Sequence, residues 1–211
     1  LEQILAIAMA EAVDAVVIAG DIYDRSIPAA EAVTVLDRFL TDLGKAGISV
    51  LMISGNHDSA ERIGFAGEIL KEQQIHIAGG YSDTLKQVTF QDEYGKVHFI
   101  LLPFFKPAVA GAVNSEEAVK RVLSGCDLKN KDDRYVLVSH FFVTDQGREP
   151  EMSDAETTLH VGGIDNVDAA VFVGFDYTAL GHIHKPQRIG SRSVYYSGAP
   201  LAYTFSETEH I

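Results

Sequence analysis

Side chains that can bind metal ions recur in this sequence directly after short apolar runs. The segments concerned are Gly20–Asp24, Gly55–Asp58, Ser139–His140 and Gly181–His184. If each apolar run is a strand of one α/β sheet, these segments lie at the carboxyl ends of the strands, where ligands bind in open sheets. The pattern therefore predicts that Asp, Asn and His side chains meet at one edge.

Each of these motifs has a plainer explanation when it is taken alone. Gly-Asp after a strand is a common turn in which Asp caps the next helix, and Asn-His-Asp is also good turn chemistry. His182 and His184 are more specific, because residues i and i+2 of a strand share one face and could converge on one metal centre. The joint occurrence of the motifs favours a metal site.

The residue types also fit one another as ligands. Carboxylate, amide oxygen and imidazole form a mixed set without thiolate, which suits Mn, Fe or Zn better than a structural zinc site. A carboxylate can bridge two ions about 3.5–4 Å apart, which is the arrangement used for two-metal phosphoester hydrolysis. The sequence therefore predicts phosphoester chemistry.

The order of the motifs resembles that of the calcineurin-like metallophosphoesterases. The segments that carry the resemblance are Gly-Asp-x-x-Asp, Gly-Asn-His-Asp, a lone His and Gly-His-x-His, from Gly20 to His184. Residues 102–104, 179–186 and 196–200 are similar to the nuclease subunits of SbcCD-type double-strand-break repair complexes. The resemblance implies an α/β fold, a metallophosphoesterase β-sandwich of two mixed sheets flanked by helices. It also implies one nuclease domain over residues 1–211, truncated at both ends.

The resemblance assigns metal ligands residue by residue. It implies that Asp21 bridges two ions and that His184 binds the first. The second ion would have three further ligands, Asn56, His140 and His182. The family opens with an Asp-x-His that binds the first ion, and this sequence has none before Asp21. We therefore expect one ion held well and the other held weakly, so that this chain is impaired as an enzyme.

The remaining motif residues have supporting or catalytic roles by the same resemblance. His57 would be the catalytic histidine that approaches the scissile phosphate without binding metal, stabilising its charge or protonating the leaving oxygen. Asp24 and Asp58 would orient their neighbours rather than bind metal.

The resemblance implies a metal-dependent DNA exonuclease and endonuclease acting on double-strand ends and hairpins. Its cofactors would be two divalent ions, with Mn²⁺ expected and Fe, Zn or Mg as alternatives. Its partners would be an SbcC-type ATPase subunit and a second copy of the chain. Apolar Val33, Phe39 and Ile63 could form the dimer contact, although an intramolecular core is an equal explanation.

Two other functions stay open at this point. One is a phosphodiesterase or phosphatase of the same fold with a small substrate, and the other is a scaffold that has lost its metals. The net charge of −13 argues against a broad basic face for DNA. It is explained by solubility or by carboxylates that bind cations.

The composition limits the location of the chain. No apolar run reaches the roughly 18 residues of a membrane span, so we expect no membrane association. Cys126 is the only cysteine, which excludes a disulfide framework and favours the reducing cytoplasm.

The apolar patterns predict alternating strands and helices in the first part of the chain. Runs at 15–19 and 48–53 are typical of buried strands, and the spacing of apolar residues predicts helices over 29–43 and 60–72. Later in the chain we expect a hairpin from 85–90 and 97–102, a helix over 116–123, and strands at 135–138, 177–180 and 193–196. We expect this second half to turn towards antiparallel pairing.

Overall fold

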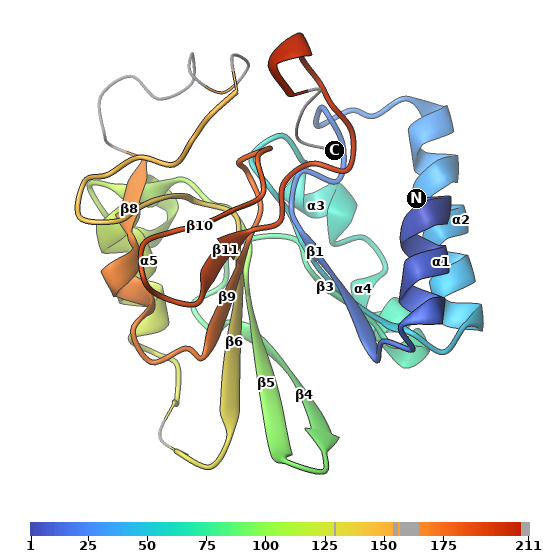
Figure 1. The fold of residues 1–211 in the computed structure, drawn as a ribbon, viewed down its shortest axis with the longest axis horizontal. Helices are drawn as coiled ribbons and strands as arrows, with labels where there is room; N and C mark the ends of the chain where they lie inside the picture. The colour runs from blue at the N-terminus through green and yellow to red at the C-terminus, as the bar shows by residue number, and fades with distance from the viewer. Residues whose placement is uncertain (129, 154–155, 157–164, 208–211) are drawn as a thin grey trace.

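The computed structural model describes every residue except 129, 154–155, 157–164 and 208–211. Its first sheet has three parallel strands in the order β1-β2-β3. The elements of this part are α1 (Glu2–Ala10), β1 (Ala15–Ala19), α2 (Ala30–Lys45), β2 (Ser49–Ile53) and β3 (Ile75–Ala78). α2 buries Phe39 and Leu43, which lie one helical turn apart, against the sheet. Both helices lie on its outer side (Figure 1).

The second sheet has six strands in the order β10-β11-β9-β6-β5-β4. Its strands are β4 (Lys86–Asp92), β5 (Gly95–Leu102), β6 (Arg134–Ser139), β9 (Tyr177–Leu180), β10 (Gln187–Arg188) and β11 (Val194–Tyr196). The β4–β5 hairpin is antiparallel, as expected, but β5, β6, β9 and β11 are parallel to one another. The expected turn towards antiparallel pairing is therefore limited to the β4–β5 and β10–β11 pairs.

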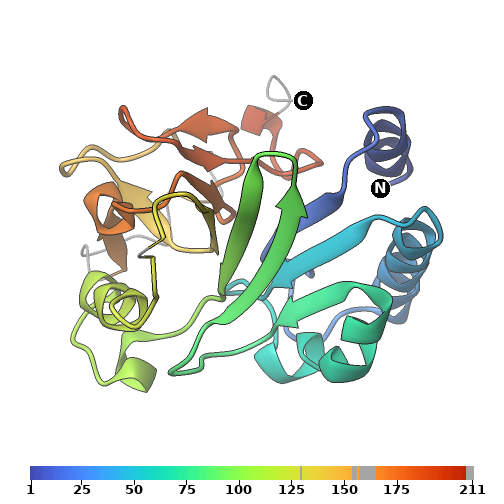
Figure 2. The same cartoon turned by 90° about the horizontal axis from the view of Figure 1, so that it is seen from below.

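The two sheets pack face to face around a small apolar core. Leu51 and Ile53 of β2 contact Leu101 of β5 and Val138 of β6 in this core, and all four are fully buried. Figure 2 shows the β4–β5 hairpin beside the first sheet. This arrangement of sheets flanked by helices confirms the fold class expected from the sequence. Within the described residues, the first sheet contains only parallel strands.

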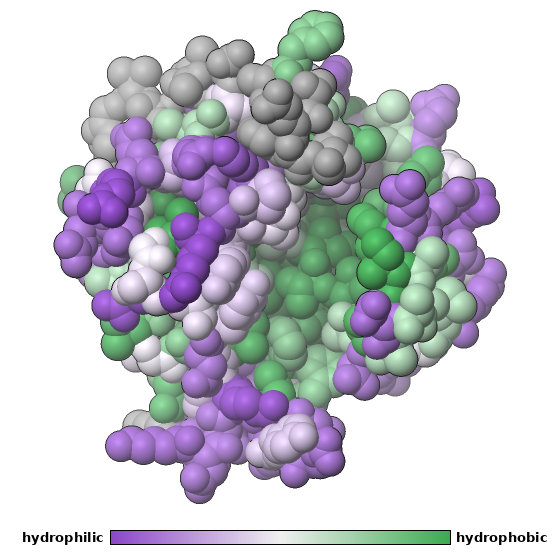
Figure 3. Space-filling view, viewed as in Figure 1, coloured by the Kyte–Doolittle hydropathy of each residue, from purple (hydrophilic) through white to green (hydrophobic). Residues whose placement is uncertain are grey.

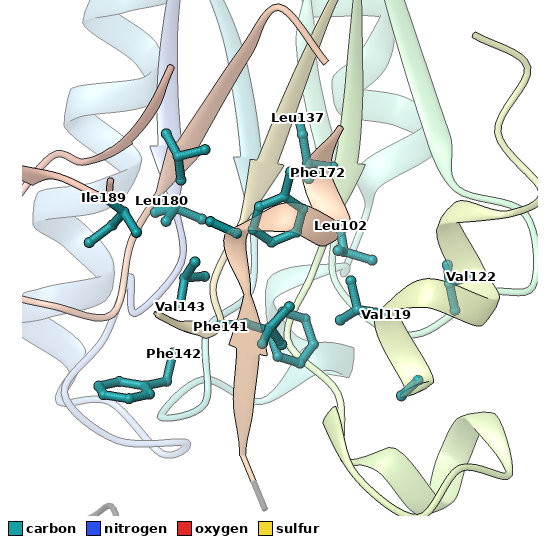
Figure 4. Packing of buried hydrophobic residues seen from close by; sticks show 14 of the residues in the cluster. Leu102, Val119, Val122, Leu137, Phe141, Phe142, Val143, Phe172, Leu180 and Ile189 are labelled. Carbon is teal, nitrogen blue, oxygen red and sulfur yellow. The ribbon is translucent and has the colours of Figure 1, made fainter. Parts of the chain in front are cut away.

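A larger core covers the other face of the second sheet. Leu102, Leu137 and Leu180 come from its adjacent strands and pack in one cluster with Phe141 and Phe172 (Figure 4). The elements that cover this face are α5 (Ser115–Leu123), β7 (Phe142–Thr144), β8 (Asn166–Asp168) and the 3₁₀ turns Pro107–Ala110 and Ala169–Phe172. This core fixes the ends of β6 and β9, which carry the histidine motifs.

The predicted helix over 60–72 is broken into short pieces. These are α3 (Ala60–Ile63), α4 (Gly67–Leu70) and the 3₁₀ turn Lys71–Gln73. Ala66 adopts a left-handed conformation with φ +58°, which interrupts the helical hydrogen bonding between α3 and α4. β3, which follows, was not predicted because its four-residue run is too short to show a period.

β1 is less buried than its apolar sequence predicts. All five of its residues are only half-buried, whereas every residue of β2 is buried. Among the described residues, β1 pairs only with β2, so one of its edges has no strand beside it. Figure 3 shows hydrophobic surface in the hollow between the two halves of the molecule.

None of the helices formed by the described residues combines the length and apolar character needed to cross a membrane.

Candidate metal centre

Asp21 leaves the end of β1 in a conformation that sets its carboxylate beside the next strand end. Its φ is +47°, a left-handed conformation that non-glycine residues adopt rarely. Its Oδ1 accepts a hydrogen bond from the His57 N–H at 3.0 Å. A Cβ on Gly55 would lie 2.1 Å from this oxygen, so only glycine allows the two loops to approach so closely.

Asp58 joins the loop after β1 to the loop after β2. Its carboxylate accepts hydrogen bonds from the backbone N–H groups of Ile22 at 3.1 Å, Tyr23 at 3.0 Å and Gly55 at 2.8 Å. Three donors on one carboxylate fix both loops at once. Asp58 thus positions the segments that carry Asp21 and Asn56.

Four side chains from four strand ends converge at this edge. The Nε2 atom of His140 lies 3.1 Å from Asp21 Oδ2 and 3.1 Å from Asn56 Oδ1. The Nδ1 atom of His182 lies 2.9 Å from the same Asn56 oxygen. The ligand atoms of Asp21, His140 and His182 all lie within 4.8 Å of one another. At this spacing one metal ion is able to contact all three ligand atoms.

The hydrogen bonds of His140 test whether a cation fits among these groups. Its Nδ1 lies 2.6 Å from the Ala19 carbonyl oxygen, which can only accept, so Nδ1 carries a proton. In the neutral ring Nε2 then has a lone pair, and it faces two acceptor oxygens, those of Asp21 and Asn56. At 3.1 Å these atoms are too close for a water molecule to lie between them, and the His140 side chain is 0% exposed. A divalent cation between them satisfies all three groups, and the residues therefore fit a metal ion.

The charge of Asp21 is consistent with this role. Burial raises the pKa of this carboxyl group, but the hydrogen bond and the charge of the protonated form of His140, together with the His57 N–H, lower it below its ordinary value. A divalent cation in contact with Asp21 would act in the same direction when the His140 ring is neutral. The carboxylate is therefore ionised at neutral pH and available as a ligand.

His184 does not join this cluster. β9 ends at Leu180 and His182 has φ +91°, so residues 182 and 184 do not share a strand face as the sequence argument assumed. The Nδ1 atom of His184 instead lies 2.9 Å from Glu207 Oε1. Burial raises the pKa of Glu207, but hydrogen bonds from the Tyr203 N–H and the His184 ring outweigh burial and lower it to about 2.

His57 and Asp24 lie at the rim of the cluster. The His57 Nδ1 atom lies 2.9 Å from the backbone oxygen of Asp24. The carboxylate of Asp24 forms an exposed ion pair with Arg25 at 2.8 Å, so Asp24 orients His57 through its main chain rather than its side chain. The His57 side chain is exposed to solvent.

Glu207 and Glu156 are polar residues of the site that the sequence did not reveal. Both are buried, and both bind His184. Neither has a motif or a spacing that separates it from the other glutamates, so no local signal could have found it.

The profile of the family described as "Calcineurin-like phosphoesterase" matches residues 1–186. The chain belongs to this family.

The phosphoesterase is also similar to individual curated proteins. It is 32% identical over 211 residues to the D subunit of the nuclease SbcCD from Staphylococcus saprophyticus, covering 93% of this chain and 52% of that protein. It is 34% identical over 206 residues to the protein of the same name from Staphylococcus epidermidis, covering 92% of this chain and 52% of the relative. The phosphoesterase thus spans about half the length of these relatives.

A solved structure gives a weaker similarity. It is the phosphopantetheinyl hydrolase PptH of Mycobacterium tuberculosis, with a TM-score of 0.48 and 14% identity, covering 92% of this chain and 81% of the other. The family assignment rests on the profile and the curated relatives.

Proposed function

We propose that this phosphoesterase is a metal-dependent nuclease that hydrolyses phosphodiester bonds in DNA. The observation that carries the proposal is the buried His140 Nε2, which faces the oxygens of Asp21 and Asn56 and leaves a place for a cation. The similarity to proteins named as part of the nuclease SbcCD supports DNA as the substrate.

The proposed metal centre holds two divalent ions, with Mn²⁺ as the expected metal. Asp21 would contact both, and Asn56, His140 and His182 would complete one site. His184 would bind the other ion through Nε2, together with ligands from a further strand. The edge of β1 that no described strand covers supports this arrangement, because a parallel strand that paired there would end beside Asp21.

The residues around the ions have separate tasks in the proposed hydrolysis. Bound divalent ions would lower the pKa of water and neutralise the phosphoryl oxygens. The Asp24 carbonyl oxygen requires a proton on His57 Nδ1, which fixes the orientation of the ring. A proton on Nε2 could then stabilise the phosphate or pass to the leaving oxygen. Asp58 keeps the loops that carry these groups together.

The partners proposed for the phosphoesterase are double-stranded DNA ends or hairpins, an SbcC-type ATPase subunit and a second copy of the chain. Phe39 and Ile63 are buried in the core beside the first sheet, so they are not available for a dimer contact. Val33 of α2 is 45% exposed and remains available for such a contact.

We propose that the protein is located in the cytoplasm, because its single cysteine suits a reducing compartment. We also propose that residues 1–211 form one domain.

A phosphodiesterase or phosphatase with a small substrate is the second candidate. The net charge of −13 favours it, because an acidic surface repels the DNA backbone. A protein of this fold that acts only as a scaffold is the third.

Hydrolysis of linear duplex DNA and of a small chromogenic phosphodiester, each with Mn²⁺, separates these candidates. The nuclease proposal predicts Mn²⁺-dependent cleavage of the duplex, and turnover of the small ester alone would support the second candidate. Binding of Mn²⁺ by the full-length protein without hydrolysis of either substrate would contradict both. His57→Gln is expected to lower kcat by about 10²–10⁴-fold and to leave Mn²⁺ affinity unchanged.

A further inference from the structure

Two buried carboxylates contact His184, the motif histidine that lies outside the metal cluster. Glu207 Oε1 lies 2.9 Å from His184 Nδ1, and the Glu207 side chain is only 3% exposed. Its other oxygen accepts the Tyr203 N–H at 2.5 Å. Glu207 comes from the 3₁₀ turn Phe205–Glu207 near the end of the described chain, and no motif of the family resemblance includes it.

Glu156 holds the main chain of the same histidine. Its Oε1 accepts the backbone N–H of His184 at 2.6 Å, and its Oε2 accepts the N–H of Ser153 at 2.6 Å. Glu156 is 5% exposed. Glu156 therefore fixes the backbone at residue 184, and Glu207 contacts the ring of the same residue.

The geometry determines what the ring can do. An ionised carboxylate can only accept hydrogen bonds, so contact with Glu207 places the imidazole proton on Nδ1. The lone pair of the neutral ring then lies on Nε2, the opposite nitrogen. The Tyr203 ring lies 5.1 Å from the His184 ring, tilted by 37°, and packs beside it. Metal-binding histidines characteristically donate their second ring N–H to a carboxylate or carbonyl.

We propose that Glu207 is a positioning residue that sets the tautomer of His184, so that its Nε2 is presented to a divalent cation. The proposal rests on the proposed metal-dependent function. It goes beyond that function in one respect. The ring of His184, the second histidine of the Gly-His-x-His motif, is oriented for metal binding by Glu207, which belongs to none of the motifs. A purely structural contact, by contrast, would hold the chain segment without directing the ring nitrogen to a metal.

The tautomer can be measured directly in the metal-free protein. Long-range ¹H–¹⁵N correlation spectra at about pH 8, where an ordinary histidine is neutral, distinguish Nδ1–H from Nε2–H. We expect His184 to be the Nδ1–H tautomer in the unaltered chain and a mixture in Glu207→Ala. Glu207→Gln keeps an acceptor oxygen and is expected to restore most of the Nδ1–H form.

Metal affinity provides the second measurement. Calorimetric titrations with Mn²⁺ report how many ions bind and the affinity of each. In Glu207→Ala we expect one of the binding events to be about 10–100-fold weaker and the other to be unchanged. Glu151→Ala is the matched control, because Glu151 pairs with Lys185, next to His184, and its side chain is 73% exposed. This control should leave both the tautomer and the affinity unchanged.

The outcomes separate this proposal from the proposed function. An Nε2–H or doubly protonated His184 in the unaltered chain would overturn the role of Glu207 and leave the nuclease proposal standing. A Glu207→Ala variant that folds and keeps the Nδ1–H tautomer would overturn it as well. If the unaltered chain shows the Nδ1–H tautomer but binds no Mn²⁺ at any histidine, the proposed function fails instead.

Discussion

Replacing Gly181 by alanine should disrupt the metal centre without changing any ligand. A Cβ at this position would lie 2.0 Å from the Ala19 carbonyl oxygen and 2.8 Å from His140 Nδ1. These two atoms form the 2.6 Å hydrogen bond that fixes the His140 ring. The ends of β1 and β9 must therefore separate, and the His140 ring loses its acceptor.

The size of the effect follows from two contributions. Forcing a methyl group into a packed interior costs about 1–3 kcal/mol, and leaving a buried polar group unpaired costs about 1–3 kcal/mol. Taking the middle of both ranges, we expect the free energy of unfolding to fall by about 4 kcal/mol. For a chain of this size that corresponds to a fall in Tm of about 8–16 °C. Mn²⁺ affinity should fall as well, because His140 no longer faces Asp21 and Asn56.

The control for Gly181→Ala is Gly44→Ala. Gly44 lies in α2, where a Cβ would meet nothing within 4 Å. Alanine there should be neutral or stabilise the protein by about 0.5–1 kcal/mol. Thermal unfolding and Mn²⁺ titration of both variants test the argument. A Gly181→Ala variant with the Tm and the Mn²⁺ affinity of the unaltered chain would refute the close packing of these strand ends.

Three further predictions concern residues around the site and in the second sheet. Tyr196→Phe removes the buried hydroxyl that accepts the Val143 N–H at 2.7 Å and donates to the Phe141 carbonyl at 3.1 Å. Calorimetry should show that the free energy of unfolding falls by about 2 kcal/mol. An unchanged Tm would show that the hydroxyl is dispensable. Asp58→Asn replaces one acceptor oxygen by a donor that faces backbone N–H groups. Titration should show weaker Mn²⁺ binding, and thermal unfolding should show a lower Tm. Undiminished binding would mean that other contacts hold the loops. The hydrogen bond from His98, aided by Asn130 and the charge of Lys96, lowers the pKa of Asp133 below its ordinary 3.8. Because the lowered pKa belongs to the folded state, this stabilisation is complete above pH 3.8 and is lost as the pH falls further. The Tm gap between Asp133→Asn and the unaltered chain should therefore be constant at neutral pH and narrow below pH 3.8, and a gap that widens in acid would contradict the sign.

The sequence was sufficient to predict the meeting of Asp21, Asn56, His140 and His182. Each follows an apolar run, and parallel strands bring their carboxyl ends to one edge, so position in the chain determined position in space. The glycines of the motifs have a physical role that the spacing alone does not explain. Gly55 and Gly181 allow strand ends to approach within distances that a Cβ would prevent.

The sequence was insufficient where the backbone leaves regular geometry. His182 and His184 would share a face only in a continuing strand, whereas β9 ends at Leu180 and the two rings have different partners. Glu207 contacts a histidine 23 positions earlier in the chain, and no local pattern encodes such a contact. The partial exposure of β1 was likewise not predicted, because an apolar run does not reveal how many neighbours its strand has.

The anomalous diffraction of crystals grown with Mn²⁺ tests the central claim most directly. We predict an anomalous peak in coordination contact with Asp21, Asn56, His140 Nε2 and His182 Nδ1. Absence of a peak there, with Mn²⁺ bound elsewhere or with the His140 Nε2 directed away from Asp21, would contradict it.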